Sequence, residues 1–185
     1  MDTLKNLCLR KMYKEIVRID NSLRSYQQEA KESIFAAWDE CDNVMFQMPT
    51  GTGKTRLFTS IISDIKVWGV IYNTDAKVLI IAHRIELIEQ ISESLKKYKV
   101  NHGIIAGGKD RNLRPEVQVA SIQTITHRSN ADVAKSLAVD FVIIDEAHHS
   151  AANSYKKLWA LYPNAKKLGV TATPWRMNHL GFSSI

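Results

Sequence analysis

The chain has 185 residues, of which 45% are apolar, and its formal net charge is +6. This length suits one compact domain with its own hydrophobic core. No apolar run reaches the roughly 18 residues that a membrane span needs, and Met1 to Lys5 lacks the apolar core of a secretory signal peptide. We therefore expect a cytoplasmic protein with no membrane partner. The basic excess fits a polyanion partner, although solubility alone would also explain it.

Residues 1–22 are expected to form an amphipathic helix that packs on the domain as an accessory element. Its apolar residues recur every three or four positions, at Leu4, Leu7, Cys8, Met12, Ile16 and Ile19. A second helix is predicted at 25–39, followed by a turn at Asp42 and Asn43. Nothing in the first helix points to chemistry.

From residue 44 onward, short apolar strands alternate with helices. The predicted strands are 44–48, 78–82, 104–105, 117–120, 139–144 and 167–171, and the predicted helices are 53–67, 85–97 and 155–161. Continuous apolar strands separated by helices favour an α/β fold, in which a mainly parallel sheet is covered by helices on both faces. Ligands of such sheets bind at the carboxyl ends of the strands. A glycine-rich motif and an acidic motif both follow strands in this sequence.

A candidate phosphate-binding loop lies between a strand and a helix and reads Pro49-Thr50-Gly51-Thr52-Gly53-Lys54-Thr55. Gly51 and Gly53 allow successive backbone N–H groups to converge on phosphate oxygens, and the helix N-terminus faces the same anion. Lys54 places an ammonium on the β- and γ-phosphates of ATP, and the Thr55 hydroxyl can ligate Mg²⁺. Met48 stands where the general motif has glycine. The alternative, a glycine turn that only caps a helix, is disfavoured by the strand–loop–helix order.

Two carboxylates, Asp145 and Glu146, follow the most apolar predicted strand. Hydrolysis of ATP needs one carboxylate to hold the metal and its water shell, and a base to orient the attacking water. We expect Asp145 to take the first role and Glu146 the second. An acidic pair after a strand is often only a solvated turn, but a phosphate loop in the same chain favours the catalytic interpretation.

Three motifs together resemble motifs I, II and III of superfamily 2 helicases: Gly51 to Thr55, Asp145-Glu146-Ala147-His148 and Thr171-Ala172-Thr173-Pro174. A more specific resemblance comes from the residues around these motifs, at Leu23 to Ala30, Met48 to Thr50 and Gly169 to Arg176. Their sequence resembles the DEAD/DEAH-box branch, which includes the type III res motor subunits of restriction enzymes, XPB-like DNA helicases and phage helicases. Members of that branch commonly lack the first glycine of the loop, which accounts for Met48. The resemblance extends from about Leu23 to Phe182. It implies a RecA-like P-loop NTPase domain in residues 23–185, with motifs Q to III.

The resemblance also implies roles for single residues. Arg24, Tyr26 and Gln27 correspond to the adenine-recognising segment, with a ring for stacking and an amide that reads the base edge; Tyr26 has the alternative of a core aromatic at the start of a helix. His148 corresponds to the residue that links the ATP site to nucleic-acid binding, through contacts with the Thr171 and Thr173 motif. The implied catalytic residues are Lys54, Asp145, Glu146 and His148.

A nucleic-acid surface is implied by three further segments: His83 and Arg84, Gly107 and Gly108, and Gln123 and Thr124. These residue types would contact phosphates and sugars, so binding would depend little on base sequence and strongly on salt. The sequence around Asp145 and Thr171 resembles DNA helicases more than RNA helicases, so the resemblance favours DNA over RNA. Ordinary turn chemistry is the alternative, above all for the two glycines.

The function that the resemblance implies is the ATP-binding motor domain of a superfamily 2 DNA helicase or translocase, with ATP and Mg²⁺ as cofactors. The motifs of a second RecA-like domain do not occur in these 185 residues. We therefore expect that such a domain is needed in cis or in trans, and that the chain alone hydrolyses ATP slowly. One alternative is an ATP-dependent nucleic-acid clamp or adaptor without motor cycling. Another alternative is a P-loop phosphotransferase, but that class of enzyme does not account for the presence of the Thr171 to Pro174 motif.

Overall fold

The computed structural model describes residues 16–145 and 152–172 of the chain. In chain order, its elements are α3 (Ser25–Glu40), β1 (Asn43–Gln47), α4 (Lys54–Ile71), β2 (Val78–Ala82), α5 (Ile85–Lys97), β3 (His102–Ile105), β4 (Val117–Ser121), α6 (Ile122–Ile125), the 3-10 helix η1 (Arg128–Asn130), α7 (Ala131–Ser136), β5 (Phe141–Asp145), α8 (Ala152–Leu161) and β6 (Lys166–Thr171).

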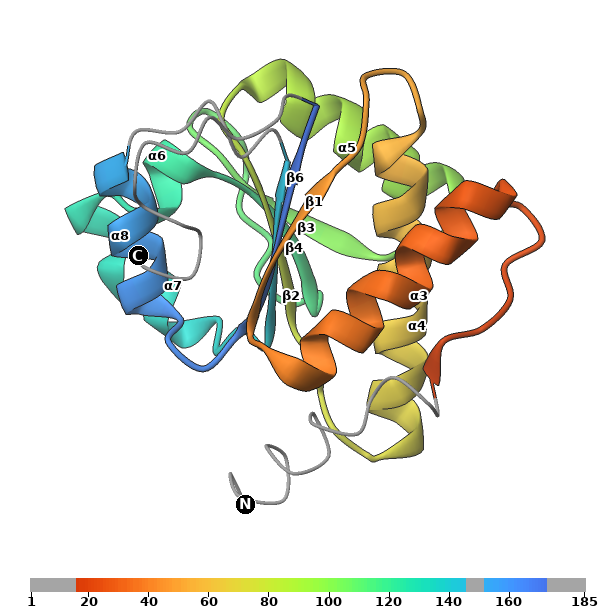
Figure 1. The fold of residues 1–185 in the computed structure, drawn as a ribbon. Coiled ribbons are helices and arrows are strands. Elements are labelled where there is room, and N and C mark those ends of the chain that lie inside the picture. The colour runs from red at the N-terminus through yellow and green to blue at the C-terminus, as the bar shows by residue number, and fades with distance from the viewer. Residues whose placement is uncertain (1–15, 146–151, 173–185) are drawn as a thin grey trace.

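The six strands form one sheet in the order β1-β6-β5-β2-β4-β3, and every neighbouring pair is parallel. Helices α3, α4 and α5 cover one face of the sheet, and α6, α7 and α8 cover the other (Figure 1). The predicted α/β fold, with a parallel sheet covered on both faces, is confirmed. Because the strands are parallel, their carboxyl ends share one edge, which is where such sheets bind ligands.

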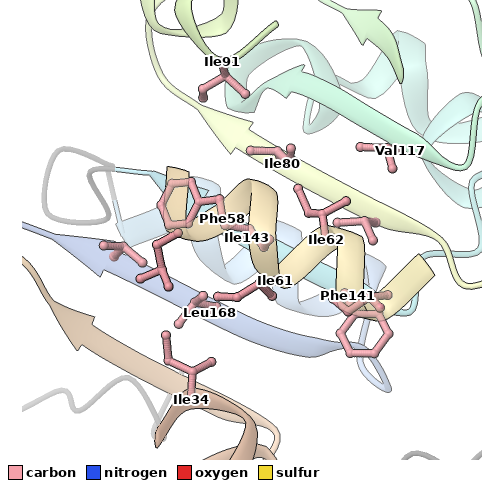
Figure 2. Close-up of a cluster of buried hydrophobic side chains, with 14 of the residues drawn as sticks. Ile34, Phe58, Ile61, Ile62, Ile80, Ile91, Val117, Phe141, Ile143 and Leu168 are labelled. Carbon is pink, nitrogen blue, oxygen red and sulfur yellow. The ribbon is translucent and has the colours of Figure 1, made fainter. Parts of the chain in front are cut away.

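The strands β2, β5 and β6 are buried along their whole length, because helices exclude water from both of their faces. Alternate side chains of each strand enter two separate cores. Ile80, Ile143 and Leu168 belong to the core under α3, α4 and α5, whereas Leu79 and Val142 belong to the core under α6, α7 and α8. Figure 2 shows the first core, where Phe58, Ile61 and Ile62 of α4 lie against the sheet. This packing fixes α4, and with it the loop that precedes α4.

The expected accessory helix over residues 1–22 is wrong for its last part. Residues 1–15 lie outside the described residues; Ile16 is helical and buried, but residues 17–20 have no regular structure and residues 21–22 form a turn. Ile19, which we expected on the packed face, is 83% exposed. The physical reason is electrostatic: Arg18 and Asp20 form ion pairs with side chains of α4, and these pairs hold the chain alongside that helix.

Candidate nucleotide site

The strand register brings the predicted motifs to one edge of the sheet. Gln47, the last residue of β1, pairs with Thr171, and Val170 pairs with Asp145 on the next strand. The backbone N–H of Met48 then donates to the carbonyl of Thr171 at 2.9 Å. The start of the phosphate loop, Thr171 and Asp145 therefore lie on three adjacent strand ends, as the parallel order β1-β6-β5 requires.

The loop between β1 and α4 has the backbone of an anion-binding turn. Gly51 and Gly53 have φ values of +78° and +85°, in the left-handed region that favours glycine. Gly53 is the N-cap of α4, so the helix begins at Lys54. No acidic side chain lies in the first turn of this 18-residue helix, so its free N–H groups and Lys54 together present positive charge to a phosphate.

The N-terminus of α3 holds the phosphate loop from the side. Tyr26 Oη and Gln27 Nε2 each donate to the carbonyl of Thr52 at 2.9 Å, and Gln27 Nε2 also donates to the carbonyl of Gly53 at 3.3 Å. Gln27 Oε1 accepts from the backbone N–H of Arg24 at 2.9 Å. All three residues of the predicted adenine segment thus lie beside the loop.

The environments of Tyr26 and Gln27 differ. Tyr26 is 39% exposed, so it does not serve as a core aromatic, and its ring remains accessible next to the loop. Gln27 is buried, and both hydrogens of its amide nitrogen are engaged by the loop. In this arrangement Gln27 has only the second lone pair of Oε1 left for a base edge, so its main contacts are with the loop backbone.

The residues expected to hold Mg²⁺ are oxygen donors on neighbouring elements. Thr55 lies in the first turn of α4, and Asp145 is the buried last residue of β5. Hydroxyl and carboxylate oxygens suit Mg²⁺, which keeps water and substrate phosphates as its other ligands. Across residues 16–145 and 152–172, no group of three His, Cys, Asp or Glu side chains could hold a metal ion. Mg²⁺ here would therefore need water and phosphate oxygens as further ligands.

Three predicted site residues, Glu146, His148 and Thr173, lie outside the described residues. Their roles as base and as coupling residues stay predictions. Of the coupling pair, Thr171 is described, and it is buried at the end of β6 beside the phosphate loop.

The candidate nucleic-acid residues follow the other three strands, β2, β4 and β3. Arg84 is exposed and is the N-cap residue of α5, directly after His83. Gln123 Nε2 donates to the carbonyl of His83 at 3.2 Å, which joins segments 40 residues apart. Ser121 Oγ donates to Gln123 Oε1 at 2.7 Å and accepts from the Thr124 N–H at 3.4 Å.

The glycine pair after β3 completes this part of the edge. Gly107 and Gly108 are exposed, and a Cβ built on either glycine would contact nothing within 4 Å. Gly108 has a φ of +73°. The backbone there is thus open to a large ligand. The sheet order places the candidate nucleotide residues on one half of the edge and the candidate nucleic-acid residues on the other half.

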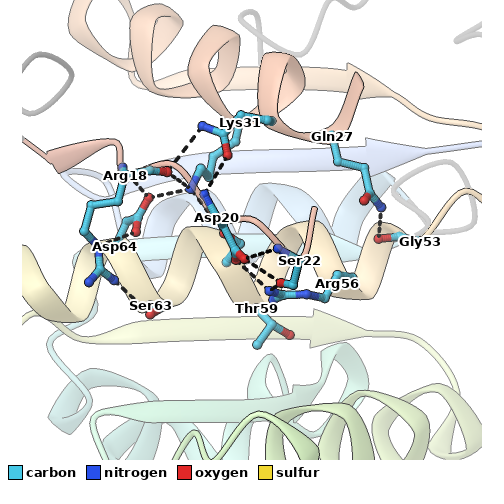
Figure 3. Close-up of polar contacts among 12 residues, drawn as sticks. Arg18, Asp20, Ser22, Gln27, Lys31, Gly53, Arg56, Thr59, Ser63 and Asp64 are labelled. Atoms are coloured by element: carbon cyan, nitrogen blue, oxygen red, sulfur yellow. Dashed lines mark hydrogen bonds and ion pairs between the residues drawn. The ribbon is translucent and has the colours of Figure 1, made fainter. Parts of the chain in front are cut away.

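Sequence reasoning missed a set of charged residues behind the loop, shown in Figure 3. Arg56 Nη2 lies 2.6 Å from Asp20 Oδ2, and buried Lys31 lies 2.9 Å from Asp64 Oδ2, which also pairs with Arg18. The only sequence signal was the place of Arg56, directly after the phosphate-loop motif. No spacing rule connects residues this far apart.

The fold defines a class, the RecA-like P-loop NTPase fold. Residues 20–176 match the family of the type III restriction enzyme res subunit, and the chain belongs to that family. No helix within the described ranges is long and apolar enough to cross a membrane.

The sequence is also similar to two curated helicase-type proteins. The DNA 3'-5' translocase XPB2 of Sulfurisphaera tokodaii is 34% identical over 157 residues, which cover 83% of this chain and 31% of that protein. The putative ATP-dependent helicase IRC3 of Saccharomyces cerevisiae is 35% identical over 143 residues, which cover 74% of this chain and 20% of that protein. The chain therefore spans less than a third of the length of either relative.

Solved structures share the fold. The SWI2/SNF2 ATPase core of Sulfolobus solfataricus, in complex with dsDNA, superposes with a TM-score of 0.68 at 18% identity, covering 92% of this chain and 39% of that one. The UvsW helicase of bacteriophage T4 gives a TM-score of 0.64 at 19% identity, covering 88% and 57%. Similarity at this level of identity establishes the architecture alone.

Proposed function

We propose that this chain is the ATP-binding motor domain of a superfamily 2 DNA helicase or translocase. Joined to a second RecA-like domain, it uses ATP hydrolysis to move along nucleic acid or to unwind it. The observation that carries this proposal is that one half of the sheet edge holds the candidate phosphate loop and Asp145, and the other half has open backbone and an exposed arginine. Membership of the res-subunit family supports it.

In the proposed reaction, the first turn of α4 and Lys54 bind the phosphates of ATP and hold them in line for attack by water. Thr55 and Asp145 would hold Mg²⁺, which supplies charge neutralisation at the phosphate oxygens. Glu146 is the proposed base that orients the attacking water. The second domain would close the site and contribute arginine side chains to the phosphates.

We further propose that the nucleic acid is DNA, held mainly through its backbone. The support is the type of group present: the Arg84 side chain and the exposed backbone at Gly107 and Gly108. XPB2, the relative named above, is a DNA translocase, which supports DNA over RNA.

The test is ATP turnover by this chain alone and by the chain joined to a second RecA-like domain, each with double-stranded DNA, single-stranded DNA or RNA. We expect slow hydrolysis by the chain alone. The joined protein should gain at least about 10³-fold, because arginine fingers contribute that much to phosphoryl transfer. DNA should stimulate turnover more than RNA does.

Two outcomes would contradict the motor. Robust unwinding by the chain alone would show that no second domain is needed. ATP-dependent binding of DNA with no stimulation of turnover in the joined protein would identify a clamp.

A further inference from the structure

The segment at residues 17–24, which we call the strap, runs along α4 and leads into α3 (Figure 3). Its outer anchor is Arg18, whose Nε lies 3.0 Å from Asp64 Oδ1. Its inner anchor is Asp20, whose Oδ2 lies 2.6 Å from Arg56 Nη2. The Arg56 guanidinium also lies over the ring of Tyr98, 4.1 Å from its centroid. Arg56 is thus fixed between the strap and α5.

Asp20 organises the turn that leads into α3. Its Oδ1 accepts from the backbone N–H of Ser22 at 3.0 Å and from the Ser22 hydroxyl, and its carbonyl accepts from the Leu23 N–H at 2.9 Å. Burial would raise the pKa of Asp20, but hydrogen bonds from Ser22 and Ser60 and the charge of Arg56 outweigh burial and lower the pKa to about 2. Asp20 is therefore ionised at neutral pH, as the ion pair requires.

The turn ends at Arg24, the N-cap residue of α3, and so sets where the exposed side chains of that helix start lie. Arg24 Nη1 donates to Tyr26 Oη at 3.4 Å, and Tyr26 Oη donates to the Thr52 carbonyl of the phosphate loop. A flat guanidinium and a flat phenol ring thus stand exposed beside the loop. Both kinds of face stack on a purine base.

Arg56 lies in the same helical turn as Thr55 and Lys54. The pair between Asp20 and Arg56 therefore connects the exposed Arg24 and Tyr26 faces to the turn that would bind the phosphates. Several supports of the phosphate loop do not involve Asp20. They are β1, the Met48 bond to Thr171, and the bonds from Gln27 Nε2 to the loop carbonyls.

We propose that Asp20, acting through Arg56, is a positioning residue for the base-binding surface: it sets the affinity for the adenine end of ATP and leaves the affinity for the triphosphate end unchanged. This role rests on the proposed function. It predicts a loss that depends on the presence of the base, which a merely structural role of Asp20 would not produce.

The test compares Mg-ATP with Mg-tripolyphosphate, which lacks the base, as ligands of the full 185-residue chain in titration calorimetry. In Asp20→Ala the dissociation constant for ATP should rise about tenfold, the size of one lost stacking contact on a base. The constant for tripolyphosphate should change by less than about twofold. Arg56→Lys, which keeps a cation for Asp20, should retain most of the ATP affinity.

Arg18→Ala is the matched control, because it releases the outer anchor of the strap and leaves the pair of Asp20 with Arg56 intact. It should leave both constants unchanged. If Asp20→Ala does not fold, as judged by circular dichroism, Asp20→Asn removes the charge in the same shape and should show the same selective loss.

Lys54→Ala separates this inference from the proposed function, since it should weaken the binding of both ligands. Equal effects of Asp20→Ala on ATP and on tripolyphosphate, or no effect on either, would overturn the positioning role alone. A wild-type chain that bound neither ligand would overturn the proposed function and this role with it.

Discussion

Gly53 meets two constraints at once, whereas Gly51, two residues earlier, meets one. Both have positive φ values, which cost a residue with a Cβ roughly 1–2 kcal/mol. At Gly51 a Cβ would contact nothing within 4 Å, but at Gly53 it would lie 2.5 Å from Gln27 Nε2. The Gln27 side chain can move away only by giving up its hydrogen bonds to the loop carbonyls.

Gly53→Ala should therefore destabilise the chain more than Gly51→Ala does. The extra cost should be about 1 kcal/mol, the net value of a hydrogen bond lost at the loop. Urea denaturation of both variants measures the difference in the free energy of unfolding. Equal destabilisation would show that Gln27 does not restrain the loop through this contact.

Candidate site residues could be named from the sequence where a motif consists of consecutive positions. The loop at 49–55 and Asp145 follow from short motifs placed after strands. The partners of Arg56 could not be predicted, because Asp20 lies 36 residues away and meets it only after α3 and α4 have packed. Gln27 lies beside the candidate phosphate loop, and its role at adenine stays a prediction; its bonds to Thr52 and Gly53 could not be predicted because they depend on the loop geometry.

Helices α3 and α4 are joined by a buried ion pair between Lys31 and Asp64. Their side chains are 0% and 3% exposed, and the Nζ–Oδ2 distance is 2.9 Å. Lys31 also donates to the carbonyl of Arg18 at 2.6 Å and to Ser60 Oγ at 3.2 Å. The Lys31 ammonium thus has three polar partners, and these interactions offset the cost of burying its charge.

Lys31→Met should cost about 3 kcal/mol of unfolding free energy, because it leaves buried Asp64 with Arg18 as its remaining ion-pair partner. Lys31→Met combined with Asp64→Leu should recover part of that loss. Lys109→Met provides the control, since it breaks the exposed pair of Lys109 with Glu89 and should cost less than about 1 kcal/mol. Chemical denaturation of the wild type and the three variants measures these free energies of unfolding. A double variant less stable than Lys31→Met would contradict this account.

Most elements followed from the hydrophobic pattern, and the exceptions have physical causes. The range predicted for α5, 85–97, is the observed one, because a 13-residue helix with a regular apolar stripe carries a clear signal. α4 extends four residues past the predicted end at Val67, leaving Val70 and Ile71 exposed. η1 and α7 escaped prediction because pieces of three and six residues are too short for periodicity. The chain after Ile16 follows ion pairs, which hydrophobic periodicity does not report.

At the scale of the whole molecule, the order of the strands separates the two candidate sites. Strands β1, β6 and β5 end at the candidate nucleotide residues, and β2, β4 and β3 end at the candidate nucleic-acid residues. The alternation of strands and helices predicts a parallel sheet but does not predict this order, because periodicity does not report which strands become neighbours: β1 and β2 are consecutive in the chain but separated by β6 and β5 in the sheet. The two halves meet where β5 pairs with β2, so the candidate nucleotide residues end one strand away from the candidate nucleic-acid residues.

The most direct test of the central claim is Mg-ATP binding by the wild-type chain and by Lys54→Ala, measured by titration calorimetry. Lys66→Ala, on the same helix but in an ion pair with Glu116 at the far end from the loop, is the control. The account predicts that Lys54→Ala weakens ATP binding at least about tenfold, since a charge-assisted contact contributes roughly 1.5–3 kcal/mol, and that Lys66→Ala changes it less than about twofold. Undiminished ATP binding by Lys54→Ala would contradict it.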